Sequence, residues 1–160
     1  MTSSSPVLPN VSNVSWQRSL EECARDVFQI MLGSGFQVDG EPAPAAFSLS
    51  AVVGFAGQVR GLLTLRCSHA SALSIAARML GIAPALAEPE MDDALGELSN
   101  MIGGSFKTKL EQDGFQCMIS VPTVISGSDY KLHSLADGRM TQLAGRFDGG
   151  TIEITLQLQH

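Results

Sequence analysis

Residues 89–114 read PEMDDALGELSNMIGGSFKTKLEQDG and predict one long amphipathic helix. Pro89 suits the first helical turn, acidic residues follow it, lysines come late, and Gly114 ends the segment. At about 100° per residue, one side of this helix is mostly apolar and is predicted to face the core. That side holds Met91, Ala94, Leu95, Leu98, Ile102, Ser105 and Lys109, with Met101 and Phe106 at its edges.

The opposite side of this helix combines polar groups with bare backbone. It holds Asp93, Glu97, Asn100 and Gly104 in a narrow stripe, with Gly96, Gly103 and Lys107 beside it. A glycine inside a helix costs about 1 kcal/mol relative to alanine, so three of them on an outward side indicate that something must approach closely. Periodicity leaves two explanations open. Either a partner protein approaches this side, or another helix of the same fold packs across the glycines and the polar groups are merely solvated.

Two further helices are indicated by spacings of three and four. The first runs from Trp16 to Met31 and is closed by Gly33. The second, HASALSIAARMLG, starts after the N-cap residue Ser68 and ends at Gly81. Its buried stripe is predicted to be Leu73, Ala76, Ala77 and Leu80.

The remaining segments are β-rich. Residues 47–57 and 59–67 flank Gly57-Gln58 as a tight hairpin, and Gly61 within the second strand indicates a bulge or close packing. Residues 115–122 form a strand that Pro122 closes, and 139–147 and 151–159 form a second hairpin. The order of elements predicts an α/β (α+β) sandwich, with helices packed on a largely antiparallel sheet.

Length and composition limit the classes of function. At 160 residues we expect a single domain over residues 15–160, after a disordered leader over 1–14. The net charge of -6, without a run of Lys or Arg, argues against nucleic acid as a partner. The three cysteines are scattered, which favours free buried thiols. The sequence contains neither a membrane-length apolar run nor a signal peptide, so we expect a cytoplasmic protein that does not bind membranes.

Four positions resemble the motif of the CheC/CheX/FliY chemotaxis phosphatases. The motif is Asp or Ser, three residues, Glu, two residues, Asn and a distant Pro, and it is matched here by Asp93, Glu97, Asn100 and Pro122. The segment NMIGG, the hairpin from Gly57 to Leu65 and the helix end at 77–81 also look like this family. A single copy of the motif resembles the CheX type, whose members are generally homodimers. The resemblance implies a CheC-like fold and a homodimer, and terminal strands such as 151–159 could supply the edge that pairs.

The resemblance also implies an activity, the removal of the aspartyl phosphate from a CheY-like receiver domain of a response regulator. Asn100 would orient the attacking water, and Glu97 would anchor a receiver lysine. Asp93 would make a helix-face contact and Pro122 would shape the nearby strand end, while Gly96, Gly103 and Gly104 would make room for the receiver. The Mg²⁺ would come from the receiver, so no cofactor of the chain's own is expected.

Two other functions were weighed against this one. A non-catalytic receiver-binding or flagellar-motor adaptor of the same fold stays open, although Glu97 and Asn100 favour activity. A metal site is disfavoured because His69, His133 and His160 lie far from the acidic residues with no ligand-like spacing. The glycine-rich pieces lack a GK[ST] ending, and no Cys-His or Ser-His pairing has a recognisable context.

Overall fold

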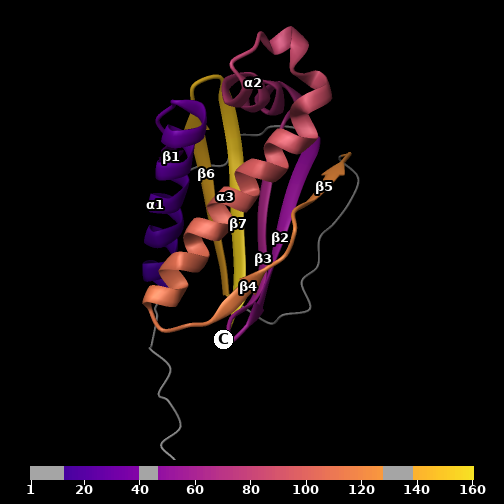
Figure 1. Ribbon diagram of the computed structural model, residues 1–160. Helices are drawn as coiled ribbons and strands as arrows, with labels where there is room; N and C mark the ends of the chain where they lie inside the picture. Colours follow the sequence, from indigo (N-terminus) through magenta and orange to yellow (C-terminus); the bar gives the residue numbers. More distant parts are fainter. Residues whose placement is uncertain (1–12, 40–46, 128–138) are drawn as a thin grey trace, which may run out of the picture.

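The computed structural model describes residues 13–39, 47–127 and 139–160, and three helices cover one face of an antiparallel sheet (Figure 1). The predicted fold class is confirmed. The predicted leader lies outside the described residues except for its last two positions. The helices are α1 (Asn13–Leu32), α2 (His69–Leu80) and α3 (Met91–Gln112), with short 3₁₀ turns η1 (Pro84–Leu86) and η2 (Glu88–Glu90) before α3.

The sheet has the strand order β1-β6-β7-β3-β2-β4, and β5 also pairs with β2. The strands are β1 (Gln37–Asp39), β2 (Leu49–Gly57), β3 (Arg60–Cys67), β4 (Cys117–Ile119), β5 (Thr123–Ser126), β6 (Arg139–Phe147) and β7 (Gly150–Gln159). Because β7 pairs with β6 on one side and β3 on the other, the expectation that the last strand leaves an open edge is wrong. Strands β1 and β5 were not predicted.

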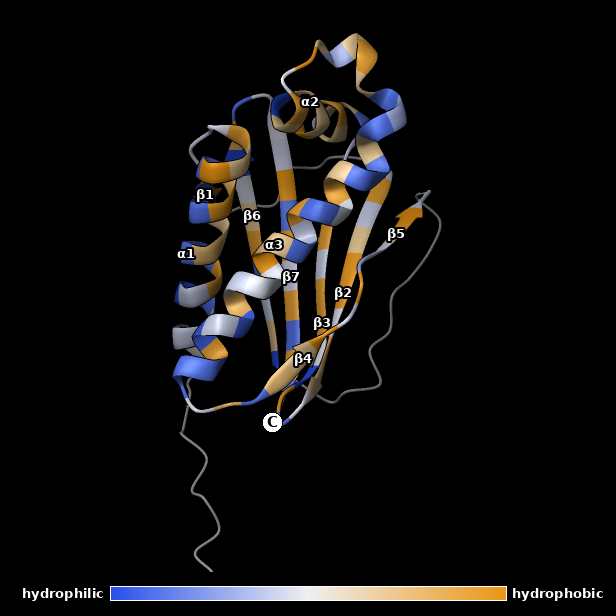
Figure 2. Ribbon diagram, viewed as in Figure 1, coloured by the Kyte–Doolittle hydropathy of each residue, from blue (hydrophilic) through white to orange (hydrophobic). Residues whose placement is uncertain are grey.

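The core lies between the helices and the sheet. Apolar residues alternate along the strands, and the apolar sides of the helices turn towards them (Figure 2). Aromatic contacts join the layers: Phe28 of α1 meets Phe147 of β6 at 5.2 Å between ring centroids, and Phe106 of α3 meets Phe55 of β2 at 6.2 Å. Both predicted hairpins are confirmed.

Gly61 is a site of close packing rather than a bulge. The β3–β7 register runs through it without interruption, and its φ is 151°. A Cβ added at Gly61 would lie 1.8 Å from the carbonyl oxygen of Gln157. The backbones of β3 and β7 can therefore approach this closely only because residue 61 has no side chain.

Helix α2 has the predicted caps but a different buried side. Ser68 Oγ accepts a hydrogen bond from the Ser71 backbone N–H, and Gly81 ends the helix in the left-handed conformation. Leu80, predicted to be buried, is 51% exposed, and Leu73 is only half-buried. The β6–β7 turn lies against α2, where Ser71 Oγ accepts a hydrogen bond from the Thr151 N–H at 3.1 Å. The buried side of α2 consists of Ser71, Ala72, Ile75, Ala76 and Ala77.

Candidate functional site

Helix α3 crosses the helix-covered face of the sheet in front of β2 and β3 (Figure 1). It begins directly after η2, which has Pro89 in its first turn, and Asp92 and Asp93 lie in the first turn of α3. These carboxylates are favourable at the positive end of the helix dipole. At the other end, Lys109 Nζ donates a hydrogen bond of 2.7 Å to Glu22 of α1, which ties α3 to its neighbour.

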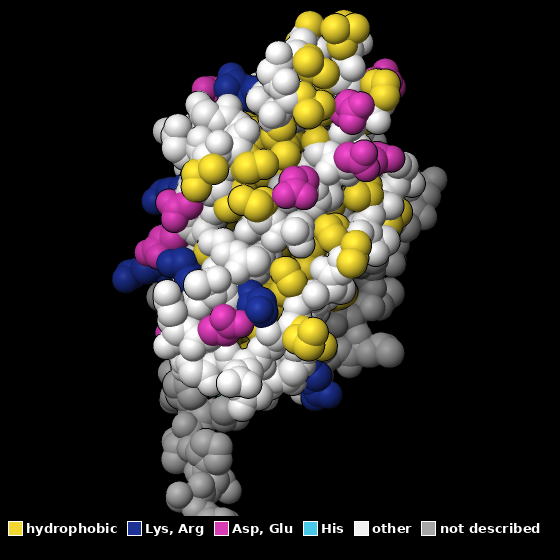
Figure 3. All heavy atoms as spheres, viewed as in Figure 1, with side chains coloured by type: hydrophobic (Ala, Val, Ile, Leu, Met, Phe, Trp, Pro, Cys, Tyr) yellow, Lys and Arg dark blue, Asp and Glu magenta, His cyan; other side chains and the backbone are white. Residues whose placement is uncertain are grey.

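The predicted polar stripe faces away from the core. Asp93 and Glu97 are exposed, while Asn100 and Gly104 are half-buried on the same side. Successive members of the stripe are three or four residues apart, so their side chains share one side of the helix. Figure 3 shows acidic side chains over the first half of α3, with apolar side chains on both sides of them.

Two of the three glycines are not where the sequence placed them. Gly96 and Gly103 are buried, so the expectation that they lie on the outward side is wrong. A Cβ at Gly103 would meet Val53 of β2 at 3.4 Å, and one at Gly96 would meet Val124 of β5 at the same distance. Strands pack across these glycines, and not another helix. Gly104 has nothing within 4 Å of an added Cβ and is the open glycine of the three.

Pro122 lies beside α3 although it is distant in sequence. A Cβ at Gly96 would come within 3.8 Å of Pro122 Cβ, so the residue before Glu97 faces this proline. The strand predicted over 115–122 and closed by Pro122 is found only as β4, Cys117–Ile119, and β5 resumes pairing with β2 directly after Pro122. The structure thus brings Asp93, Glu97, Asn100 and Pro122 to one region.

The stripe carries polar groups without internal partners. Within residues 13–39, 47–127 and 139–160, neither Asp93 nor Glu97 forms an ion pair, and the Asn100 carboxamide forms no hydrogen bond. Lys107, beside the stripe, is held by Glu111 at 3.0 Å. A carboxylate and an amide that are free of internal contacts are available to bind a partner.

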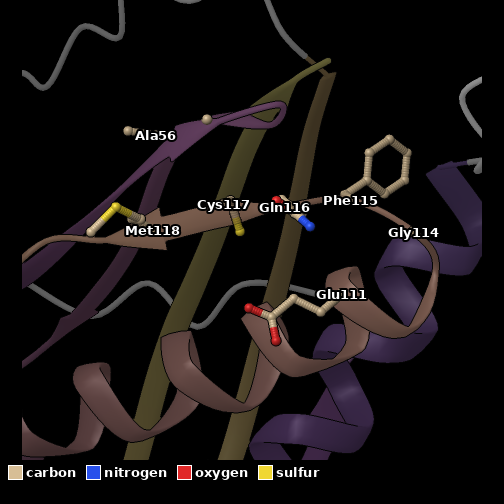
Figure 4. Close-up of a pocket in the computed structure, with 8 residues that line it drawn as sticks. Ala56, Glu111, Gly114, Phe115, Gln116, Cys117 and Met118 are labelled. Atoms are coloured by element: carbon tan, nitrogen blue, oxygen red, sulfur yellow. The ribbon is translucent and has the colours of Figure 1, made fainter. Parts of the chain in front are cut away.

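A hollow of about 690 Å³ lies at the far end of α3, away from this stripe (Figure 4). Its lining comes from the end of β2, the end of α3 and β4, and includes Glu111, Phe115 and Cys117. None of the motif residues lines it. Burial raises the pKa of the Cys117 thiol, which favours its neutral form over the nucleophilic thiolate.

All three cysteines are free and buried, as predicted. Burial raises the pKa of Cys23, and it raises the pKa of Cys67 to about 12. Among the described residues no group of three or more His, Cys, Asp or Glu side chains is arranged to hold a metal ion. His133, one of the histidines weighed as a ligand, lies outside the described residues. None of the described helices has the length and apolar character needed to span a membrane.

A family model and a sequence relative indicate the same family. The family model described as chemotaxis phosphatase CheX matches residues 49–144, which include the whole of α3 and Pro122. The CheY-P phosphatase CheX of Thermotoga maritima is 33% identical over 120 residues, covering 72% of this chain and 76% of that protein.

Solved structures share the fold. The chemotaxis protein CheX of Vibrio vulnificus superposes with a TM-score of 0.79 at 23% identity, covering 94% of this chain and 100% of that one. The Borrelia burgdorferi CheX in a CheX-CheY-BeF3-Mg+2 complex has a TM-score of 0.67 at 23% identity, covering 91% of this chain and 98% of that one.

Proposed function

The chain belongs to the CheX family of chemotaxis phosphatases, and we propose that it hydrolyses the aspartyl phosphate of a response-regulator receiver domain. The observation that carries this proposal is the outward stripe of α3, where Glu97 and Asn100 have no partner among the described residues and Gly104 leaves the helix surface open. The relative from Thermotoga maritima is a CheY-P phosphatase, and the one from Borrelia burgdorferi is seen in a complex with CheY, which supports this class of substrate.

Asn100 is the proposed catalytic residue. Hydrolysis needs a water in line with the bond between phosphorus and the aspartate oxygen; the water oxygen bonds to phosphorus, and the aspartate leaves as a carboxylate beside inorganic phosphate. A carboxamide has a carbonyl that accepts a hydrogen bond from this water and an NH₂ group that donates one. Asn100 can therefore orient the water without a shifted pKa, while the receiver's own Mg²⁺ neutralises charge on the phosphoryl oxygens.

Glu97 is the proposed anchor. It lies one helical turn from Asn100, it is exposed, and no basic side chain of the described residues neutralises it. An ion pair between Glu97 and a receiver lysine would fix how deeply and at what angle Asn100 enters the phosphorylation pocket. Asp93, one turn earlier on the same side, would add a contact at the helix face.

The three glycines of α3 have different proposed roles. Gly104 lies in the stripe with open space above it, and it would let the receiver approach the helix backbone. Gly96 and Gly103 instead let β5 and β2 pack closely against the inner side of α3. That close packing fixes the height of the stripe above the sheet, so these two glycines would act on the site only through its position.

We also propose that the protein is a homodimer that acts in the cytoplasm, where response regulators work. Among the described residues, β1 pairs with β6 only at residues 144–146, so the stretch from Arg139 to Leu143 has no partner on that side. A second copy could pair along it. The mass in solution, measured by light scattering, tests the dimer.

The proposed activity is tested by turnover. Receivers from the same genome are phosphorylated with a small-molecule donor in the presence of Mg²⁺, and release of inorganic phosphate is followed with substoichiometric protein. Multiple turnovers on one receiver would support a phosphatase. Binding to a receiver without acceleration would contradict this proposal and favour the adaptor.

A further inference from the structure

The segment that links β4 to β5 forms a β-bulge against β2. Strand β4 pairs Ile119 with Phe55, and β5 resumes by pairing Thr123 with Val52. Between these pairs, two residues of β2 face three residues, 120–122, of the other chain segment. An extra residue of this kind bends the strand and redirects its side chains, and bulges are frequent beside functional sites.

Ser120 holds this bulge in place. Its backbone N–H donates to the Gly54 carbonyl at 2.9 Å, and its Oγ accepts from the Gly54 N–H at 2.8 Å. The same hydroxyl donates to the carbonyl of Val121 at 3.1 Å. The Gly54 N–H is thus paired with the Ser120 hydroxyl oxygen, in place of the backbone carbonyl that a regular strand would offer. These hydrogen bonds hold the segment in a fixed geometry at the sheet edge.

Val121 is 84% exposed on this fixed segment. Pro122 follows it and lies against Gly96, the residue directly before Glu97. We call residues 120–122 the shoulder. It adjoins the stripe of Asp93, Glu97 and Asn100, so an apolar side chain held by a rigid backbone borders the acidic and amide groups.

We propose that the shoulder is a second contact surface for the phosphorylated receiver domain, where Val121 packs against an apolar patch beside the receiver's phosphorylation pocket. This inference rests on the proposed function. Pro122 packs against Gly96, so the shoulder borders the stripe at Glu97, and a receiver domain seated on the stripe would extend over it. The carboxylates of Asp93 and Glu97, which form no ion pair with the described residues, would select a partner with a basic group next to that apolar patch. Because the shoulder is already ordered, docking on it loses little conformational entropy.

Val121→Ser tests this inference, since the side chain is exposed and its loss leaves the core intact. The matched control is Ile30→Ser, which removes a 73% exposed apolar side chain from α1, outside both the stripe and the proposed dimer edge. We expect Val121→Ser to raise KM for the phosphorylated receiver about tenfold with kcat unchanged, because burying a valine contributes on this scale. Ile30→Ser is expected to leave both constants unchanged.

A second pair of variants tests the role of the bulge. Ser120→Ala removes the acceptor for the Gly54 N–H and is expected to raise KM. Ser120→Thr retains a hydroxyl and is expected to have the KM of the wild type. Equal KM values for Val121→Ser and Ile30→Ser would overturn the inference, as would a loss of kcat at unchanged KM. A shift of the Val121→Ser protein from dimer to monomer would also overturn the inference, since it would show that the shoulder binds a second copy of the chain and not the receiver.

Binding separates this inference from the proposed function. The probe is the receiver activated with beryllofluoride and Mg²⁺, titrated against the wild-type protein and Val121→Ser. If the wild type binds it but never accelerates phosphate release, the phosphatase proposal fails, and the ratio of the two Kd values still tests the shoulder. If wild-type and Val121→Ser proteins bind with equal Kd, the shoulder inference fails even when phosphatase activity is present.

Discussion

The backbone of Gly103 passes so close to β2 that a Cβ added there would lie 3.4 Å from Cγ1 of Val53. The next residue, Gly104, has nothing within 4 Å of the same added atom. Two adjacent glycines of one helix therefore meet different surroundings: one packs on the sheet and the other belongs to the open stripe. This difference allows the structural and functional demands on α3 to be tested separately.

Gly103→Leu and Gly104→Leu are expected to have opposite effects. Leucine at position 103 overpacks the contact with β2 and should lower the free energy of unfolding by about 1–3 kcal/mol. Leucine at 104 meets open space, and its helix propensity should leave stability unchanged or raise it by up to about 0.8 kcal/mol. Urea unfolding measures both.

The same Gly104→Leu protein is expected to lose at least about tenfold in kcat/KM on the phosphorylated receiver, because its side chain obstructs the approach to Asn100. A folded Gly104→Leu variant that dephosphorylates the receiver as fast as the wild type would contradict the role given to this open glycine.

Gly61→Ala is expected to destabilise the sheet. The added methyl would collide with the carbonyl oxygen of Gln157, and the φ of 151° is unfavourable for alanine. We expect a loss of about 3 kcal/mol in the free energy of unfolding, measured as a lower Tm and a lower urea midpoint. Gly35→Ala is the control, since an added Cβ there meets nothing within 4 Å. An unchanged Tm for Gly61→Ala would contradict the close β3–β7 approach.

Stability in acid should depend on Glu22. The hydrogen bond from Lys109 lowers the pKa of Glu22 below 4.5 in the folded protein. A carboxyl with a lowered folded pKa adds stability above its unfolded pKa, and that stability is lost as the pH falls through the folded value. Glu22→Gln should therefore be less stable than the wild type near neutral pH and equally stable well below 4.5. Urea midpoints at both pH values measure this. Asp26→Asn is the control for loss of a surface carboxylate, since Asp26 is exposed on the same helix and forms no ion pair within the described residues. A gap between wild type and Glu22→Gln that persists in strong acid would contradict the assignment.

Much of the fold was predictable because its signals are local. The span of α3 follows from its apolar periodicity and from Pro89 and Gly114, and both hairpins follow from alternating strands around glycine turns. The three-residue β1 carries too few positions for a period to be visible. Strand β5 was missed because Pro122 indicated the end of a strand, whereas the bulge lets pairing resume after it.

The candidate site was predictable in part for a related reason. Charged and amide side chains mark the outward side of a helix, so Asp93, Glu97 and Asn100 could be placed from the sequence. Glycine has no side chain whose polarity would indicate which side of the helix it lies on. The inner side of α3 is also wide, because β2 and β5 both pack on it. Gly96 and Gly103 were therefore assigned to the wrong side. Val121 and Ser120 gave no signal of their own, since a bulge is defined by pairing with a distant strand.

The most direct test of the central claim is the effect of Asn100→Ala on two quantities measured with one receiver. Asn100 is half-buried on the outward side and forms no hydrogen bond within the described part of the chain, so its loss should leave the fold intact. We expect the rate of phosphate loss from the saturated complex to fall about 100-fold, because the water is no longer oriented. The Kd for the beryllofluoride-activated receiver should stay within about threefold of the wild-type value, a difference of less than 1 kcal/mol. An Asn100→Ala protein that dephosphorylates the receiver at the wild-type rate would contradict the claim that this carboxamide positions the attacking water.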